Sequence, residues 1–163
     1  MIKSMAVKPL NYGPLNPSDI QGKVPDVLLK PAEVFNAQSG KFVARDGTDD
    51  MDVAQSGDTQ IEGWAEVQGV TGSAAGFTVP ASTIPTRVDV INDLNARFLM
   101  PADAAVTAAI INLTCDIIVS ANVQLADVGE SNEDVLVIYD VNVALQLVEV
   151  GLNSSKMHVA GVA

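Results

Sequence analysis

The chain has little of what most enzymatic and metal sites are built from. Its 163 residues include one cysteine, Cys115, and one histidine, His158. A single cysteine excludes an intrachain disulfide and any zinc site that takes two or more cysteines from one chain. A catalytic triad would have to use His158, and the sequence has no G-x-S-x-G, P-loop, G-x-G-x-x-G or H-E-x-x-H motif.

Basic and aromatic residues are also scarce. Nine basic residues stand against 20 acidic ones, which gives a net charge of −11, and only 4% of the residues are aromatic. Nucleic acid and anionic membranes would be repelled, so neither is expected as a partner. The few aromatic side chains argue against a sugar-stacking cleft. The longest uncharged stretch, 67–86, contains three glycines and two prolines, which is typical of a loop rather than a membrane span. The first six residues lack the apolar run of a signal peptide.

The residues that are abundant favour β-structure. Valine is the commonest residue with 23 copies, and valine, isoleucine and threonine together number 41, against 12 leucines. β-Branched side chains lose rotamer freedom in helices and fit pleated sheets. The composition therefore argues against a helix bundle, a coiled coil and a transmembrane protein.

Proline and charge divide the chain into two parts. Residues 1–30 carry four lysines and two aspartates, a net charge of +2, whereas 31–163 carry −13, and five of the eight prolines lie in the first 31 residues. Proline fixes φ and removes a hydrogen-bond donor, so we expect 1–30 to be an extended, irregular arm and 31–163 to be a β-rich body. The arm either becomes ordered on a partner or is a disordered tail. Its candidate partner-binding residues are Lys3, Lys8, Tyr12, Lys23 and Lys30.

From residue 33 onward the hydrophobic pattern alternates with a period of two. It predicts a hairpin of strands 33–35 and 41–44. Further strands are expected at 60–67 (with Gly63 as a bulge), 77–79, 87–91, 96–100, 115–120, 123–128, 134–140 and 144–150, and the segment 157–160 would close the sheet. Short strands at this spacing predict a compact β-sandwich or small β-barrel with an extended N-terminal arm and at most one short helix.

The segment 101–112 has two interpretations. Asp103 is a candidate N-cap for an alanine-rich helix at 104–111, and a buried strand is the competitor because Ile110 and Ile111 are β-branched. For the core we expect several buried positions among a set of aliphatic side chains in the second half. They are Val119, Val135, Val137, Leu147 and Val148.

No group of residues predicts an active site. The loop 46–52 is rich in aspartate, but its order departs from the EF-hand pattern, so a solvated loop is favoured over a calcium site. Cys115 has no basic residue within 15 positions in the sequence, which indicates a buried structural thiol. We therefore expect a protein that is not an enzyme and that needs no metal or cofactor.

Five segments in the second half carry a family resemblance. They are 93–101 (DLNARFLMP), 113–119 (LTCDIIV), 123–126 (VQLA), 134–138 (DVLVI) and 147–150 (LVEV). In order and spacing, residues 86–163 resemble the capsid decoration (cement) proteins of tailed bacteriophages. The resemblance implies an all-β, often trimeric protein on the outside of the head, at junctions between major capsid proteins.

This resemblance predicts a structural protein of the virion that assembles in the host cytoplasm. Its expected partners are the major capsid protein and two further copies of itself, and the family supplies no catalytic residues. Two alternatives stay open: a head–tail or tail-tube component, and a β-barrel binding module. Isolated cement proteins should form small closed oligomers, whereas a tube protein should form rings or tubes.

Overall fold

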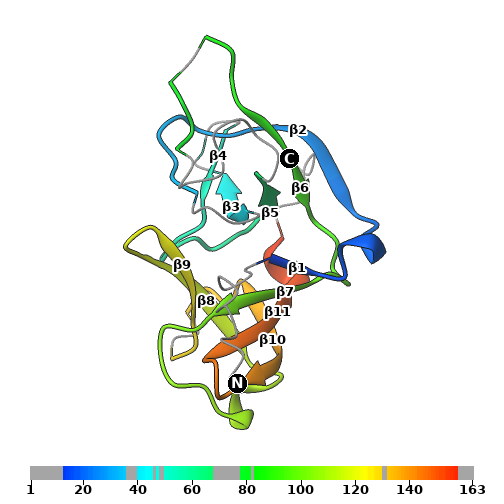
Figure 1. Cartoon of the computed structure of the whole chain (residues 1–163), viewed down its shortest axis with the longest axis vertical. Helices are drawn as coiled ribbons and strands as arrows, with labels where there is room; N and C mark the ends of the chain where they lie inside the picture. Colours follow the sequence, from blue (N-terminus) through cyan, green and yellow to red (C-terminus); the bar gives the residue numbers. More distant parts are fainter. Residues whose placement is uncertain are drawn as a thin grey trace, which may run out of the picture.

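A computed structural model describes residues 13–35, 40–45, 47, 50–67, 78–81, 83–129 and 132–157. Within these residues the chain forms two antiparallel sheets and three short 3-10 turns, η1 (Pro17–Asp19), η3 (Ala108–Ile110) and η4 (Ser154–Lys156), with no α-helix. The predicted all-β fold is thus confirmed. Figure 1 shows the five-stranded sheet in the upper half of the molecule and the six-stranded sheet in the lower half.

The six-stranded sheet has the order β1-β7-β11-β10-β8-β9. It curls into a half-barrel because β9 returns towards the end of β7. Ala102 and Ala126 form a parallel bridge there, and the Asp103 amide donates to the Ala126 carbonyl at 3.0 Å. The strand bounds are β1 Gly13–Leu15, β7 Arg97–Pro101, β8 Thr114–Ser120, β9 Val123–Asp127, β10 Leu136–Asn142 and β11 Leu147–Leu152.

The five-stranded sheet has the order β2-β6-β5-β3-β4. Its strands are β2 Lys23–Leu28, β3 Gly40–Arg45, β4 Met51–Val53, β5 Gly63–Glu66 and β6 Arg87–Ile91. Gly63 has φ +147°, and a Cβ there would lie 2.1 Å from the Ile91 carbonyl oxygen. Only glycine permits so close an approach of β5 to β6, which explains the glycine in an otherwise apolar strand.

The main core lies between the two sheets. Phe42 of β3 and Trp64 of β5 meet Phe98 of β7, and all three side chains are at most 1% exposed. The ring centroids of Phe42 lie 5.0 Å from those of both other rings, in edge-on geometry, and Trp64 stacks on Phe98 at 5.5 Å. Aromatic pairs of this kind add to the free energy gained by burial, so they tie the sheets together.

A second core covers the other face of the five-stranded sheet. Along β3 the side chains alternate, so that Phe42 belongs to the main core and Val43 to the second one. Leu29 and Phe35, from the segment that follows β2, are buried in this second core, as is Val79. The alternation is what a strand packed on both faces requires.

The first part of the chain differs from the expected separate arm. Residues 13–28 are extended apart from the turn η1, but β1 pairs with β7 and β2 pairs with β6, so each of the two sheets gains an outer strand. The expectation that residues 1–30 stay outside the body is therefore wrong for 13–28. The proline content correctly indicates extended backbone. It does not reveal the pairing, because a strand at the edge of a sheet can pair through its backbone without a regular hydrophobic pattern. Residues 1–12 lie outside the described residues.

Two other local predictions are wrong. The expected hairpin of 33–35 with 41–44 does not form, because β3 is flanked by β4 and β5, and Val34 makes only an isolated bridge with Thr78. For the segment 101–112 neither the helix nor the buried strand forms: beyond β7 it contains only the single turn η3. Asp103 does not cap it; its carboxylate accepts the Val128 amide at 3.0 Å instead.

The predicted core residues divide in a similar way. Val135, Leu147 and Val148 are buried, Val137 is half-buried, and Val119 is 39% exposed near the end of β8. Met157 bridges Ile61 in parallel, beside the five-stranded sheet, and 158–160 lie outside the described residues.

Candidate functional site

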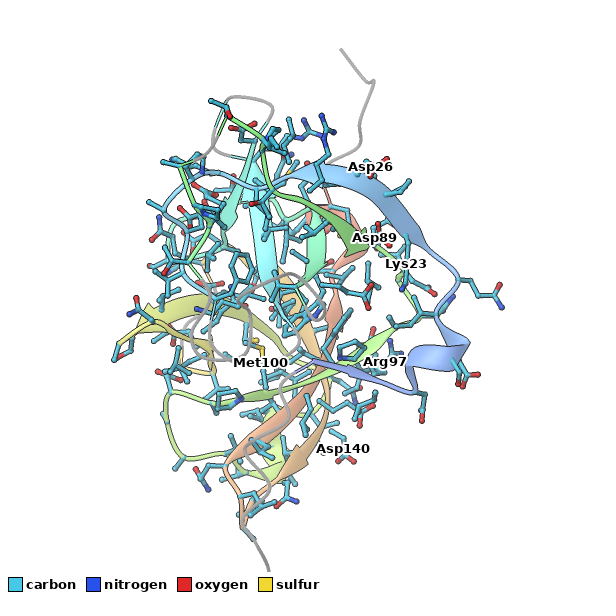
Figure 2. The ribbon with its side chains drawn as sticks, turned by 45° about the horizontal axis from the view of Figure 1, so that its top comes forward. Lys23, Asp26, Asp89, Arg97, Met100 and Asp140 are labelled. Carbon is cyan, nitrogen blue, oxygen red and sulfur yellow. The ribbon has the colours of Figure 1, made fainter. Side chains whose placement is uncertain are left out.

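The predicted partner-binding residues are not brought together where the structure describes them. The Lys23 Nζ atom lies 2.9 Å from Glu66 of β5, and the Lys30 Nζ atom lies 3.9 Å from Asp52 of β4. Both lysines thus pair with carboxylates of the body. Figure 2 shows Lys23 on the same side of the molecule as Asp26 and Asp89. Lys3, Lys8 and Tyr12 lie outside the described residues, and the partner role of all five stays a prediction.

A buried polar contact joins the β8–β9 hairpin to the five-stranded sheet. Gln124 of β9 is 4% exposed, and its Oε1 atom accepts the Phe42 amide at 2.8 Å. Its Nε2 atom donates to the carbonyls of Phe42 at 3.0 Å and Ala54 at 2.8 Å. One side chain therefore satisfies three backbone groups of the opposite sheet, which is a structural role and leaves no amide donor free for a ligand.

Lys41 is the second polar link at this place. Its side chain is buried, and its Nζ atom donates to the carbonyl of Val34 and to that of Asn122 in the β8–β9 turn. Burial lowers the pKa of Lys41 to about 8, although the Glu33 carboxylate acts in the opposite direction. A neutral amine still has the two N–H groups that these two carbonyls need, so the contact survives deprotonation.

Asp116 organises the turn before β10. Its carboxylate is buried and accepts the amides of Asn132, Glu133 and Asp134 at 2.7 to 3.0 Å. Burial raises the pKa of Asp116, but the hydrogen bonds from the Glu133 side chain and from these amides outweigh burial and lower it. The same side-chain hydrogen bond raises the pKa of Glu133. A β8 carboxylate whose hydrogen bonds fix the turn before β10 in this way is a structural group.

The remaining candidates carry little chemistry. Cys115 is buried, and burial, followed by the charge of Asp116, raises its pKa to about 12. It is a structural thiol, because a reactive one needs a lowered pKa. Of the 46–52 loop, Asp46 and Asp49 lie outside the described residues, and Asp52 faces Lys30. In the part of the chain that the structure covers, no group of three or more His, Cys, Asp or Glu side chains is placed to hold a metal ion.

An open cavity of about 230 Å³ lies beneath the outer strand β2. Arg45, Glu62 and Arg87 line it together with aliphatic side chains. The Arg45 Nε atom is 2.6 Å from the Glu62 carboxylate, and Arg87 donates to the Asp26 carbonyl at 3.1 Å. An anionic ligand in this cavity would have to bind Arg45 or Arg87, and both guanidinium groups already make these contacts within the protein.

Searches of family models, curated proteins and solved structures found no match to this chain. None of the helical segments among the described residues is long and apolar enough to cross a membrane.

Proposed function

We propose that this chain is a structural protein of a tailed-bacteriophage particle, a decoration or cement protein that binds the outside of the head. There it would stabilise the contacts between major capsid proteins. One observation carries the proposal: the five segments on which the family resemblance depends overlap β7, β8, β9, β10 and β11, and these five strands all belong to the six-stranded sheet. The resemblance thus follows one structural unit rather than scattered loops.

The chemistry of the interior supports a structural role. The three buried polar or charged side chains among the described residues, Lys41, Asp116 and Gln124, each satisfy two or three backbone groups. They hold turns and sheets together rather than converge on a cavity. A net charge of −11 also suits a protein whose outer face meets solvent on a particle surface.

Attachment to the shell is proposed to depend on residues 1–12. Lys23 and Lys30 already face carboxylates of the body, so Lys3, Lys8 and Tyr12 are the members of the predicted set for which a contact with a neighbouring capsid protein is proposed. Exposed ion pairs contribute only about 0–1 kcal/mol each. Tight binding would therefore come from apolar contacts and from several copies acting together, for which we propose a homotrimer.

Cryo-electron microscopy of the particle tests the location. The proposal predicts density for the two described sheets on the outer surface of the head, at junctions between major capsid proteins. Density in the tail tube or at the head–tail junction would favour the second virion role instead. Particles that lack the protein altogether would overturn both roles.

A further inference from the structure

One end of the six-stranded sheet is almost free of charge. It is formed by residues 102–113, which connect β7 to β8, and by 143–146, the turn between β10 and β11; we call these residues the alanine-rich end. The two segments lie together, because the Ala102 amide donates to the Gln146 carbonyl and the Val106 amide to the Gln146 Oε1 atom, both at 3.1 Å. Both segments belong to the lower end of the molecule in Figure 1.

Gln146 and Asp103 of this end make hydrogen bonds with backbone groups of the fold. Gln146 has φ +55°, and its side chain joins the amide of Val106 to the carbonyl of Val143. Asn142, just before the turn, accepts the Leu145 amide at 3.0 Å. The carboxylate of Asp103, the one charged side chain of the two segments, accepts the Val128 amide. Thr107 and Asn112 are the other exposed polar side chains of the two segments.

What the alanine-rich end presents outward is therefore mostly alkyl. Leu113 is 54% exposed, Val143 52% and Leu145 61%. Turns at a surface are normally built from Gly, Pro, Asn, Asp and Ser, so a hairpin turn with exposed valine and leucine at its tip needs an explanation. The exposed apolar side chains of the two segments are Ala104, Ala105, Ala108, Ala109, Leu113, Val143, Ala144 and Leu145.

We propose that the alanine-rich end is a self-association surface, whose occupant is the same end of a second copy of this chain. Each copy carries a net charge of −11, so two copies repel one another wherever their acidic surfaces meet. The alanine-rich end contributes one carboxylate, so two copies approach there with little repulsion and bury aliphatic side chains. A charged partner would gain no complementary charge from this surface.

The size of the surface fits a reversible contact. A stable interface usually takes about 20–30 residues from each side, and the two segments supply 16 positions, of which eight are exposed apolar ones. This is enough for an apolar centre, with Thr107, Asn112 and Asn142 as a polar rim. The inference stands on burial and charge and does not depend on the proposed location on a phage head. Like ends meet as a pair, so this contact is distinct from the contacts within the proposed homotrimer.

The first test compares two double variants by sedimentation velocity over about 1–200 μM protein, a range that covers weak association. Val143→Glu with Leu145→Glu places two carboxylates at the tip. Val24→Glu with Ile84→Glu is the control and makes the same change of charge near the other sheet. Val24 lies in β2 and is 41% exposed, and Ile84 precedes β6 and is 79% exposed. We expect the tip variant to raise the dissociation constant by about 30-fold or more and the control variant to leave it within about threefold. Thermal unfolding of both variants checks that they are folded.

A wild-type chain that stays monomeric over this range would overturn the proposal, and so would equal weakening by both double variants. A monomeric wild type whose tip variant fails to bind phage heads would assign the surface to the shell instead of a second copy.

A second test uses the inert native thiol. Cys115 is buried, so Leu145→Cys introduces the one accessible thiol of the described residues. Mild oxidation should cross-link this variant into dimers faster than an Ile84→Cys control at the same concentration, because disulfides need Cβ atoms about 4 Å apart. Equal cross-linking rates would contradict a contact at this end.

Discussion

The two sheets of this protein are assembled in different ways. Strands β7 to β11 of the six-stranded sheet follow one another within residues 97–152, and β8–β9 and β10–β11 are neighbours in sequence and in space. In the five-stranded sheet, β2 pairs with β6, so that Lys23 lies opposite Ile91, and β5 reaches β6 only after residues 67–86. Apart from β1, which joins β7 from residues 13–15, the six-stranded sheet is built from one stretch of chain, whereas the five-stranded sheet combines the local β3–β4 pair with the distant pairing of β2 and β6.

The two kinds of connection differ in the entropy that each sheet has to overcome to form. Local hairpins close short loops, whereas the pairing of β2 with β6 has to overcome the entropy of a long loop. The five-stranded sheet gains what it needs by packing on its neighbour, through the aromatic cluster and through Lys41 and Gln124. We therefore expect the two sheets to unfold as one cooperative unit.

The largest effect is expected at the aromatic contact between the sheets. Phe98→Ala removes a fully buried ring of the six-stranded sheet that packs on Phe42 and Trp64. It should lower the free energy of unfolding by about 3–5 kcal/mol in urea titrations. Leu94→Ala, at a side chain 45% exposed, should cost less than about 0.5 kcal/mol. Separate unfolding transitions for the two sheets in Phe98→Ala would contradict a shared core. A loss of stability in Phe98→Ala as small as that in Leu94→Ala would also contradict it.

A smaller loss is expected when the polar bridge is removed. Gln124→Leu keeps the size of the side chain but leaves the Phe42 amide and the Ala54 carbonyl without this partner, while the Phe42 carbonyl keeps the Ala54 amide at 2.9 Å. Buried groups deprived of a hydrogen bond cost about 1–3 kcal/mol each, and relaxation offsets part of the sum, so we expect a loss of about 3 kcal/mol. Gln55→Leu, at an exposed position, is the control and should be nearly neutral. A stable Gln124→Leu variant would show that the bridge is dispensable.

The smallest predicted effect concerns the charge of Lys41. Its pKa is about 8 in the folded protein and near 10.5 when unfolded, so the unfolded chain binds more protons between these values. The stability of the wild type relative to Lys41→Met should therefore increase by of order 1 kcal/mol as the pH rises from about 7.5 to 10. Urea titrations of both proteins at the two pH values measure the difference. A constant or falling difference would mean that Lys41 is not desolvated as described.

The sequence locates single strands in both sheets, since the strand expected at 87–91 has the bounds of β6 in the five-stranded sheet. The strand expected at 123–128 agrees with β9 to one residue, because a local hairpin shows its alternation directly. Strand β4 was not expected, and the pairing of β3 with β4 and β5 was missed, because the sequence does not reveal which distant strands become neighbours. Val119 belongs to the set of five in which several buried positions are expected, and it is 39% exposed near the end of β8.

Much of the candidate chemistry was out of reach of sequence reasoning. The inert character of Cys115 followed from the absence of nearby basic residues, but the roles of Lys41 and Gln124 depend on contacts across 81 and 82 positions. The alanine-rich end was expected as a helix or a strand from its residue types. In the structure, the hydrogen bonds of Gln146 hold the segments 102–113 and 143–146 together, and most of the exposed side chains of both segments are alkyl groups.

Binding to phage heads tests the central claim of a structural role most directly. Heads that lack the protein are mixed with the purified full-length chain or with a chain lacking residues 1–12, and the bound protein is measured after co-sedimentation. That deletion leaves β1 and β2 intact, whereas removing 1–25 would also remove β1 and half of β2. The account predicts saturable binding of the full chain to heads, no binding to isolated tails, and lower occupancy for the shortened chain at unchanged thermal stability. Absence of saturable binding to heads, or preferential binding to tails, would contradict it.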